Sequence, residues 1–236
     1  MNHKINIKLA HNIELFLKRE DLIHPLISGN KFRKLKFNII EAKKLKKESL
    51  LTFGGAYSNH ILATAAAGKV NGLKTIGVIR GDELVNNFNE NPTLKDANEL
   101  GMHFHFVDRE TFRIKDENSF IGSLVEKFGD FYLVPEGGTN ELAIKGCEEI
   151  LTQEDAFFDY ICCCVGTGGT ISGIINSSLN HQKVIGFPAL KDDFLKEDIP
   201  DLMRESKEGI VRVRKIVRDL KDFSHVDVKP EWSFTN

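Results

Sequence analysis

Short runs of apolar residues alternate along this chain with longer segments in which apolar positions recur every three or four residues. The short runs lie at residues 13–18, 50–53, 75–80, 104–107, 132–134, 160–165 and 184–187. Such runs indicate buried strands, whereas the longer spacing indicates helices. Strands that alternate with helices in this way predict parallel sheets flanked by helices, so the predicted fold class is α/β.

Residues typical of helix ends lie where this assignment needs them. Asn91 and Pro92 form an N-cap followed by a first helical position, and Gly101 provides the stop. Thr139 opens a further helical run that includes residues 143–151. No internal repeat or low-complexity linker interrupts the sequence, so the alternation holds along the chain.

Composition and charge exclude several functional classes. The chain has 236 residues, of which 41% are hydrophobic, and this allows a buried core in one large domain or two small lobes. Its net charge of −2 is spread along the sequence, which argues against a nucleic-acid partner. The N-terminus has no apolar signal core, and no stretch approaches the roughly 18 apolar residues of a membrane span. We therefore expect a cytoplasmic protein that acts on small molecules, with no membrane partner.

Cysteines and histidines give no sign of a metal site. Three of the four cysteines, Cys162, Cys163 and Cys164, are consecutive in an apolar run, which fits neither a disulfide framework nor zinc-ligand spacing. We expect them to be small buried strand residues. His103 and His105 share one strand face but lack a clear carboxylate partner, so we predict no metal there.

Three glycine-containing turns lead towards predicted helix N-termini, where free N–H groups and the helix dipole favour an anion. The most specific follows the strand at 160–165 and consists of Gly166, Thr167, Gly168, Gly169 and Thr170. A dinucleotide fingerprint would need glycine at Ile171, and a phosphate-binding P-loop would need a following Gly-Lys-Ser/Thr. Another kind of phosphate loop and a purely structural turn both remain open.

A second glycine turn, at residues 53–60, places three hydrogen-bonding side chains before an alanine-rich helix. Ser58, Asn59 and His60 would lie at the positive end of that helix, a suitable place for a carboxylate or a ring hydroxyl. A serine here also serves as an ordinary N-cap, which needs no catalytic role. The third turn, at residues 135–140, either lines the same cleft or is structural.

Two lysines lie at a predicted helix start within residues 28–35. Lys31 and Lys34 are three residues apart, so they share a helix face and suit one anionic ligand. A lysine at a helix N-terminus opposes the dipole, which lowers its pKa and favours the neutral amine that a Schiff base needs. The alternative is a solvated face, because more lysines follow in the same helix.

Taken in order, five of these segments resemble the 1-aminocyclopropane-1-carboxylate deaminase/D-cysteine desulfhydrase family. The matching segments are residues 18–22, 28–35, 54–60, 135–140 and 166–170, and the resemblance covers about residues 12–197. It implies the two-lobed pyridoxal-phosphate (PLP) fold type II, like the tryptophan synthase β subunit. The large lobe would take residues 1–48 and 156–198, and the small lobe residues 49–155.

The resemblance implies a role for each matching residue. Lys31 would bind PLP covalently as the Schiff-base lysine, and Lys34 would contact its phosphate. Asn59 would hydrogen-bond the cofactor's ring hydroxyl, and Ser58 would have a substrate-binding or catalytic role, with His60 beside them at the substrate. The phosphate would be surrounded by Gly166, Thr167, Gly168, Gly169 and Thr170.

The resemblance also implies the reaction. A small amino acid would be the substrate, through β-elimination from D-cysteine or deamination of 1-aminocyclopropane-1-carboxylate. His60 stands where the deaminases often carry glutamine, which favours the desulfhydrase branch. The alternatives are another PLP lyase, such as a D-serine dehydratase-like enzyme, and a catalytically impaired PLP-binding protein. A complete fold of this kind would form a homodimer.

The last segment, residues 199–236, changes character. It contains an amphipathic stripe that predicts a long helix, formed by Met203, Ile210, Val213, Val217 and Leu220. The segment resembles the second dimerisation helix of a sensor histidine kinase, although a helix covering the core fits the same stripe. Since family members continue further, we expect a truncated large lobe, poor solubility or dependence on a partner, impaired PLP binding and very low turnover.

Overall fold

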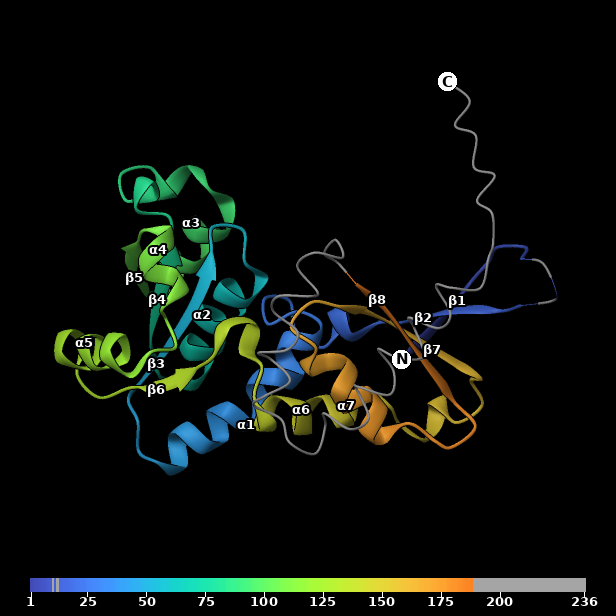
Figure 1. Ribbon diagram of the computed structural model, residues 1–236. Helices are drawn as coiled ribbons and strands as arrows, with labels where there is room; N and C mark the ends of the chain where they lie inside the picture. The colour runs from blue at the N-terminus through green and yellow to red at the C-terminus, as the bar shows by residue number, and fades with distance from the viewer. Residues whose placement is uncertain (10, 12, 189–236) are drawn as a thin grey trace, which may run out of the picture. The chain divides into compact units, whose positions relative to one another are not determined.

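The computed structural model describes residues 1–9, 11 and 13–188 (Figure 1). Its strands are β1 (Asn2–Ile5), β2 (Leu15–Lys18), β3 (Ser49–Gly55), β4 (Lys74–Arg80), β5 (Met102–Val107), β6 (Tyr132–Val134), β7 (Tyr160–Val165) and β8 (Lys183–Pro188). Its α-helices are α1 (Asn30–Lys44), α2 (Asn59–Asn71), α3 (Pro92–Glu99), α4 (Arg109–Arg113), α5 (Asn118–Phe128), α6 (Glu141–Cys147) and α7 (Gly169–Ser177). Short 3-10 helices are η2 (Glu20–Leu22), η3 (Asp82–Leu84), η4 (Phe88–Glu90), η5 (Glu136–Gly138), η6 (Glu148–Ile150) and η7 (Gln153–Asp155). The predicted α/β class is confirmed.

A parallel sheet with the strand order β5-β4-β3-β6 occupies the middle of the described chain. Leu51 of β3 pairs with Ile76 of β4 on one side and with Leu133 of β6 on the other. All of its strands fall within the predicted small lobe, residues 49–155, although the division into lobes stays a prediction. The carboxyl ends of β3 and β6 lead directly into the turns at 54–60 and 135–140.

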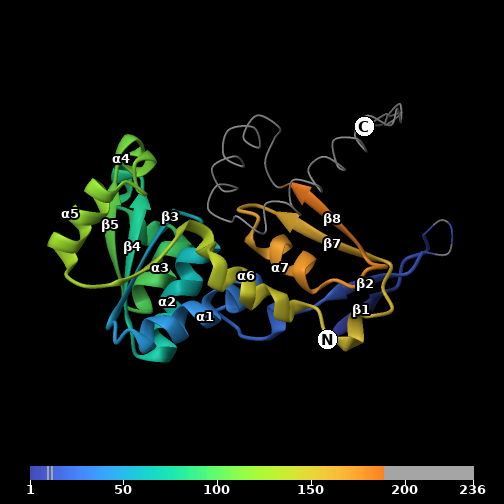
Figure 2. The same ribbon diagram turned by 60° about the horizontal axis from the view of Figure 1, so that its bottom comes forward.

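Helices cover both faces of this sheet, because successive strand residues point to opposite sides. Leu51 and Phe53 pack with α4 and α5 around Phe112 and Leu124. Leu50 lies on the other face, among the alanines of α2. Figure 2 shows α2 and α5 on opposite sides of the strands. The alanine-rich sequence of α2 thus allows a close approach of helix to sheet.

A second parallel sheet pairs β7 with β8, and α7 connects them. Ile174 of α7 packs with Ile161 and Val184 of the two strands. In both views α6 lies beside α1 and α7, and it packs against each of them (Figures 1 and 2). The three helices that carry the lysines and two of the glycine turns are therefore in contact.

Three local expectations are wrong. The strand predicted at 13–18 was expected in a parallel sheet, but β2 pairs antiparallel with β1, which has no apolar run to reveal it. Thr139 does not cap α6; Asn140 does, by accepting a hydrogen bond from the Ala143 N–H at 2.9 Å. The expected burial of the cysteines fails as well. Cys162 and Cys164 are exposed, since they alternate with Cys163, which packs against the α6–α7 core.

Other boundaries agree with the sequence. Asn91 caps α3 by accepting from the Leu94 N–H at 3.0 Å, and Pro92 is the first helical residue, as predicted.

His103 and His105 both pack edge-on against Phe128. In the part of the chain that the structure describes, no group of three or more His, Cys, Asp or Glu side chains is placed to hold a metal. Among the described helices, none is long and apolar enough to cross a membrane.

Candidate active site

Two lysines from the first turns of α1 converge on one backbone carbonyl. Lys31 Nζ donates to the Gly137 carbonyl oxygen at 3.2 Å, and Lys34 Nζ donates to the same oxygen at 3.1 Å. Lys34 also donates to the hydroxyls of Thr139 and Thr167, at 2.8 and 3.1 Å. The predicted common face of the two lysines therefore meets the turn at 135–140, which the sequence left as either structural or part of the cleft.

Burial lowers the pKa of both amines. Lys34 is 1% exposed, and its burial together with the positive charge of Lys31 lowers its pKa to about 7. The pKa of Lys31 is also lowered, chiefly by burial. The lowered pKa was expected from the helix dipole, but desolvation is its main cause. A lowered pKa makes the neutral, nucleophilic amine more available near neutral pH.

The predicted glycine loop lies beside the lysines. Together they line a cavity of about 180 Å³, whose wall contains Asn30, Lys31, Lys34, Cys164, Val165, Gly166, Thr167, Gly168, Thr170 and Ile171. Gly168 has a φ of +80°, in the left-handed region that favours glycine. The first helical bond of α7 runs from the Ser172 N–H to the Gly168 carbonyl, so the N–H groups just before it have no intrahelical acceptor. They are suited to an anion.

Two contacts of this cavity were missed by the sequence analysis. Asn30 Nδ2 donates to Thr170 Oγ1 at 2.8 Å, which joins the start of α1 to the start of α7. Thr139, expected only at a helix start, shares a hydrogen bond with Thr167 and so joins the two glycine turns. Both residues lie inside the segments that carry the family resemblance, and this was the only signal that pointed to them.

Ser58 and Asn59 follow β3 at the start of α2. Ser58 occupies the N-cap position but makes no capping hydrogen bond with its side chain, so its hydroxyl is available to another partner. It is half-buried, whereas Asn59 is exposed. The ordinary N-cap explanation of Ser58 therefore loses its support, and a substrate or cofactor contact stays a prediction for both residues.

His60 differs from its two neighbours because its side chain lies in the core. It is 1% exposed, with Nε2 2.7 Å from Thr52 Oγ1, and that hydroxyl lies 2.8 Å from the Val134 carbonyl. The single hydroxyl proton must go to the carbonyl, so His60 donates from Nε2 and leaves Nδ1 as an acceptor. Nδ1 has no partner among the described residues. Burial, with the charges of Lys31 and Lys34, lowers the His60 pKa well below its usual value, so the ring is neutral.

The donors in this cavity fit PLP. In the described part of the chain, no carboxylate lies within ion-pair distance of Lys31 or Lys34. Two amines, threonine hydroxyls and a helix N-terminus thus meet without a negative partner, which suits a phosphate. A Cβ added at Gly166 or Gly168 would meet nothing within 4 Å, so the loop leaves open space for a ligand.

Replacing Gly169 by valine is expected to weaken PLP binding. A Cβ there would lie 2.9 Å from Thr139 Cγ2 and 3.3 Å from Lys34 Cε. Overpacking of this kind costs about 1–3 kcal/mol and would displace the Lys34 amine from the loop. Titration of the folded variant with PLP gives the affinity. Gly122→Val in α5, where a Cβ meets nothing within 4 Å, is the control. Unchanged affinity in a folded Gly169→Val chain would return the loop to a structural role.

Comparison with known proteins agrees with this geometry. Residues 5–226 match the family described as pyridoxal-phosphate dependent enzyme. A Thermotoga maritima protein named "Putative 1-aminocyclopropane-1-carboxylate deaminase" is 33% identical over 224 residues, which cover 90% of this chain and 70% of the relative. The bifunctional D-cysteine desulfhydrase/1-aminocyclopropane-1-carboxylate deaminase of Arabidopsis thaliana is 32% identical over 190 residues, or 73% of this chain and 47% of its own length.

A solved structure supports the fold. The crystal structure of an ACC deaminase homologue superposes with a TM-score of 0.66 at 25% identity, covering 84% of this chain and 62% of the other. This likeness confirms PLP fold type II. The chain thus spans about half to 70% of the length of these relatives.

The matches also correct the expected extent of the resemblance. The family match continues to residue 226, so the predicted end near residue 197 is wrong. The resemblance of residues 199–236 to a sensor-kinase dimerisation helix stays a prediction. The helix predicted in that segment lies outside the described residues. The cavity, its donors and the extent of these matches lead to one conclusion: the chain belongs to the pyridoxal-phosphate dependent enzymes.

Proposed function

We propose that this chain acts on a small amino acid by PLP-dependent elimination, with D-cysteine as the substrate and pyruvate, ammonia and sulfide as the products. The observation that carries the proposal is the pair of buried amines, Lys31 and Lys34, that meet at the Gly137 carbonyl beside the glycine loop. One amine is suited to bind the cofactor's aldehyde and the other to bind its phosphate. Relatives that act on D-cysteine or on the cyclopropane substrate, by their names, support the substrate class.

The chain's own residues divide the work of such a reaction. Bound PLP withdraws electrons from the α-carbon of an attached amino acid. Lys31 holds the cofactor, and its lowered pKa keeps the amine able to take a proton from that carbon. Lys34 and the N–H groups at the start of α7 hold the phosphate. Because Lys34 accepts no proton while it pairs with phosphate, Lys31 is the base that remains.

Ser58 and Asn59 complete the proposed site from the small sheet. Asn59 binds the ring hydroxyl of the cofactor, and Ser58 offers a hydroxyl that no helix cap consumes. The neutral, buried His60 supports their segment from beneath, through Thr52 in the middle of β3. His60 therefore anchors the turn, and a direct contact between His60 and substrate would have to use Nδ1.

Deamination of 1-aminocyclopropane-1-carboxylate is the second candidate. That substrate has no α-proton, so ring opening needs a group beyond Lys31 that attacks or protonates the ring. Ser58 is the side chain available for this step, because its hydroxyl makes no capping bond. D-cysteine needs only one base, and His60 replaces the glutamine common in the deaminases, so we favour the desulfhydrase reaction.

Product assays separate these possibilities. The whole 236-residue chain, loaded with PLP, is incubated with D-cysteine, 1-aminocyclopropane-1-carboxylate, D-serine or L-cysteine, and keto acid, ammonia and sulfide are measured. We expect sulfide and pyruvate in equal amounts from D-cysteine. If only the cyclopropane substrate yields keto acid, the chain is a deaminase. If only D-serine yields keto acid, it is a dehydratase. A chain that binds PLP and releases no keto acid would be a PLP-binding protein without this activity.

The neighbouring Ser58 and Asn59 are expected to respond differently to alanine. Ser58→Ala should lower amino-acid turnover more than PLP affinity, because its hydroxyl is proposed to contact the substrate. With the cyclopropane substrate, whose ring opening needs Ser58, the loss should reach about a hundredfold, the lower end for a proton-transfer group. Asn59→Ala should instead shift the visible spectrum of the bound cofactor. Parallel spectra and initial rates measure both effects. Tyr57→Phe, at an exposed position of the same turn, is the control. Identical effects in the two alanine variants would contradict this division of roles.

A further inference from the structure

The cations of α1 are divided between two faces of the helix. Lys31 and Lys34 share one face, and Arg33 and Lys36 lie roughly opposite, since each residue turns the helix by about 100°. Arg33 and Lys36 have carboxylate partners, whereas Lys31 and Lys34 have none among the described residues. The helix thus uses one face to attach itself and keeps the other face for an anion.

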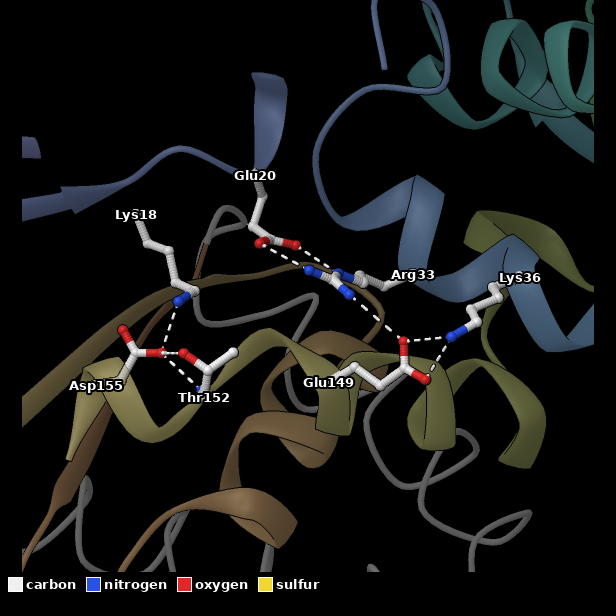
Figure 3. Close-up of polar contacts among 7 residues, drawn as sticks. All are labelled: Lys18, Glu20, Arg33, Lys36, Glu149, Thr152 and Asp155. Carbon is white, nitrogen blue, oxygen red and sulfur yellow. Dashed lines mark hydrogen bonds and ion pairs between the residues drawn. The ribbon is translucent and has the colours of Figure 1, made fainter. Parts of the chain in front are cut away.

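The attached face ends in a network of ion pairs (Figure 3). Arg33 Nε donates to Glu20 at 2.7 Å, and its Nη1 lies 3.4 Å from Glu149. Lys36 Nζ donates to both oxygens of Glu149, at 2.6 and 2.7 Å. Glu149 lies in η6, directly after α6, so it ties α1 to the end of α6. The Arg33 and Glu20 side chains are only 18% and 16% exposed, which limits screening by solvent.

Backbone contacts join the same helices. A Cβ at Gly146 of α6 would lie 2.0 Å from the Arg33 carbonyl oxygen, so α1 and α6 touch backbone to backbone. A Cβ at Gly173 of α7 would lie 2.4 Å from Cys147 Cβ and 2.6 Å from the Ile144 carbonyl oxygen. The close approach of α6 to α1 and to α7 therefore requires glycine at both positions. The stack of α1, α6 and α7 fixes the separation between the lysines and the glycine loop.

We infer that Gly146 and the Arg33–Glu149 pair are positioning residues that set where α1 holds Lys31 and Lys34 relative to the loop at 166–170. The glycine sets the approach of α1 to α6, and the ion pair fixes α1 along and around its axis. Neither touches the cofactor cavity, whose described lining contains none of these residues. This inference rests on the proposed function, in which Lys31 and Lys34 bind the cofactor. Gly146, Arg33 and Glu149 are then the residues that position these two lysines.

The Lys34 amine reports on this position. Its pKa is about 7 because burial and Lys31 lower it, and the Cys147 and Cys163 thiols oppose this. The neutral His60 faces the same amines from α2. If α1 moves away from α6, Lys34 loses its bonds to Gly137 and the two threonines and gains water. Its pKa must then rise towards the ordinary value of a lysine.

Lysine labelling of the apo chain measures this directly. The chain is treated with acetic anhydride over a range of pH, and peptide mass spectrometry gives the labelling midpoint of Lys34. We expect Gly146→Ala to raise the midpoint by about one unit or more, because the new methyl forces the helices apart. Glu149→Gln, which keeps the side-chain shape, should raise it by a smaller amount. Both should weaken PLP binding by about tenfold, as for a small displacement of the binding groups.

Two controls separate positioning from general loosening. Gly122→Ala adds a methyl in α5, where a Cβ meets nothing within 4 Å. Lys18→Met breaks the other ion pair in Figure 3, in which Lys18 Nζ lies 2.6 Å from Asp155, and is expected to lower the unfolding temperature. Both should leave the Lys34 midpoint unchanged and PLP affinity within about twofold.

The outcomes are distinct. If Gly146→Ala does not fold, Glu149→Gln decides the matter. Folded variants with the wild-type midpoint would overturn the inference, and so would an equal shift in Lys18→Met. A wild-type chain that shows the low Lys34 midpoint but binds no PLP would contradict the proposed function instead, because labelling needs no cofactor.

Discussion

Lys31→Ala is expected to abolish the visible absorption band that covalent attachment of PLP to the chain produces, while leaving the chain folded. Among the described residues the Lys31 amine makes one hydrogen bond, to the Gly137 carbonyl, and a bond of this kind contributes about 0.5–1.5 kcal/mol. Its loss is offset, because the variant no longer buries an amine whose pKa is lowered by desolvation. If Lys31 is the attachment point, as proposed, the variant loses the band of the covalently bound cofactor entirely, whereas the effect on stability is small.

Absorbance spectra, borohydride reduction and peptide mapping test this assignment together with thermal unfolding. Lys44→Ala is the matched control, since Lys44 lies in the last turn of the same helix and its exposed side chain pairs with Glu41. It should retain the full absorption band. A band retained in Lys31→Ala, or a reduced adduct mapped to another lysine such as Lys34, would show that the attachment point is elsewhere.

The sequence predicted the strands of both parallel sheets well, because buried parallel strands are short apolar runs that periodicity reveals. Each predicted run from residue 50 onwards overlaps an observed strand, such as 50–53 within β3 and 184–187 within β8. β1 was missed since His3 and Lys4 lie in a half-exposed two-stranded hairpin, where packing does not demand an apolar run. Periodicity therefore detects burial rather than strand pairing itself.

The site was predicted less completely than the fold. Lys31, Lys34 and the loop at 166–170 could be found because charge and glycine stand out in a sequence. The acceptors that hold Lys34, a backbone carbonyl and two threonines, could not, since threonine is common and Gly137 acts through its main chain. Contacts between residues 34 and 167 depend on how α6 packs between α1 and α7, which no local pattern encodes.

His60 shows the limit of reasoning from neighbours in sequence. It was grouped with Ser58 and Asn59 as a substrate contact, because all three are polar and consecutive. A helix turns by about 100° per residue, so the third member of such a run faces the core. There it meets Thr52, and only that contact identifies the protonated nitrogen.

The affinity for the cofactor's phosphate is expected to fall as pH rises above about 7, because Lys34 must be protonated to bind it. In the apo chain the Lys34 pKa is about 7, so the amine is already charged below that pH. A bound phosphate raises the Lys34 pKa, because its negative charge stabilises the protonated amine. Above pH 7, binding must therefore take up a proton, and affinity falls by up to about tenfold per pH unit until the pKa of the bound state is reached.

The acidic side has a different limit. The second pKa of a phosphate monoester is about 6, so the ligand loses charge below that pH. We therefore expect the highest affinity between about pH 6 and 7. Pyridoxine 5′-phosphate is the proper probe, because it carries the ring and the phosphate but no aldehyde. Its binding cannot include the reaction with Lys31, which a neutral amine favours and which would rise with pH.

Variants at position 34 identify the group that titrates. Lys34→Met should bind pyridoxine 5′-phosphate weakly, and its affinity should change little as the pH rises above 7. In Lys34→Arg the side chain stays charged at all accessible pH values, so the affinity of this variant should also not fall above pH 7. This holds even if the larger side chain changes the affinity itself. A Lys31→Ala background removes the other amine with a lowered pKa. If calorimetric titrations of the wild-type chain show no loss of affinity between pH 7 and 9, or if Lys34→Met keeps the wild-type slope, then another group binds the phosphate and the buried amine of Lys34 has a purely structural role.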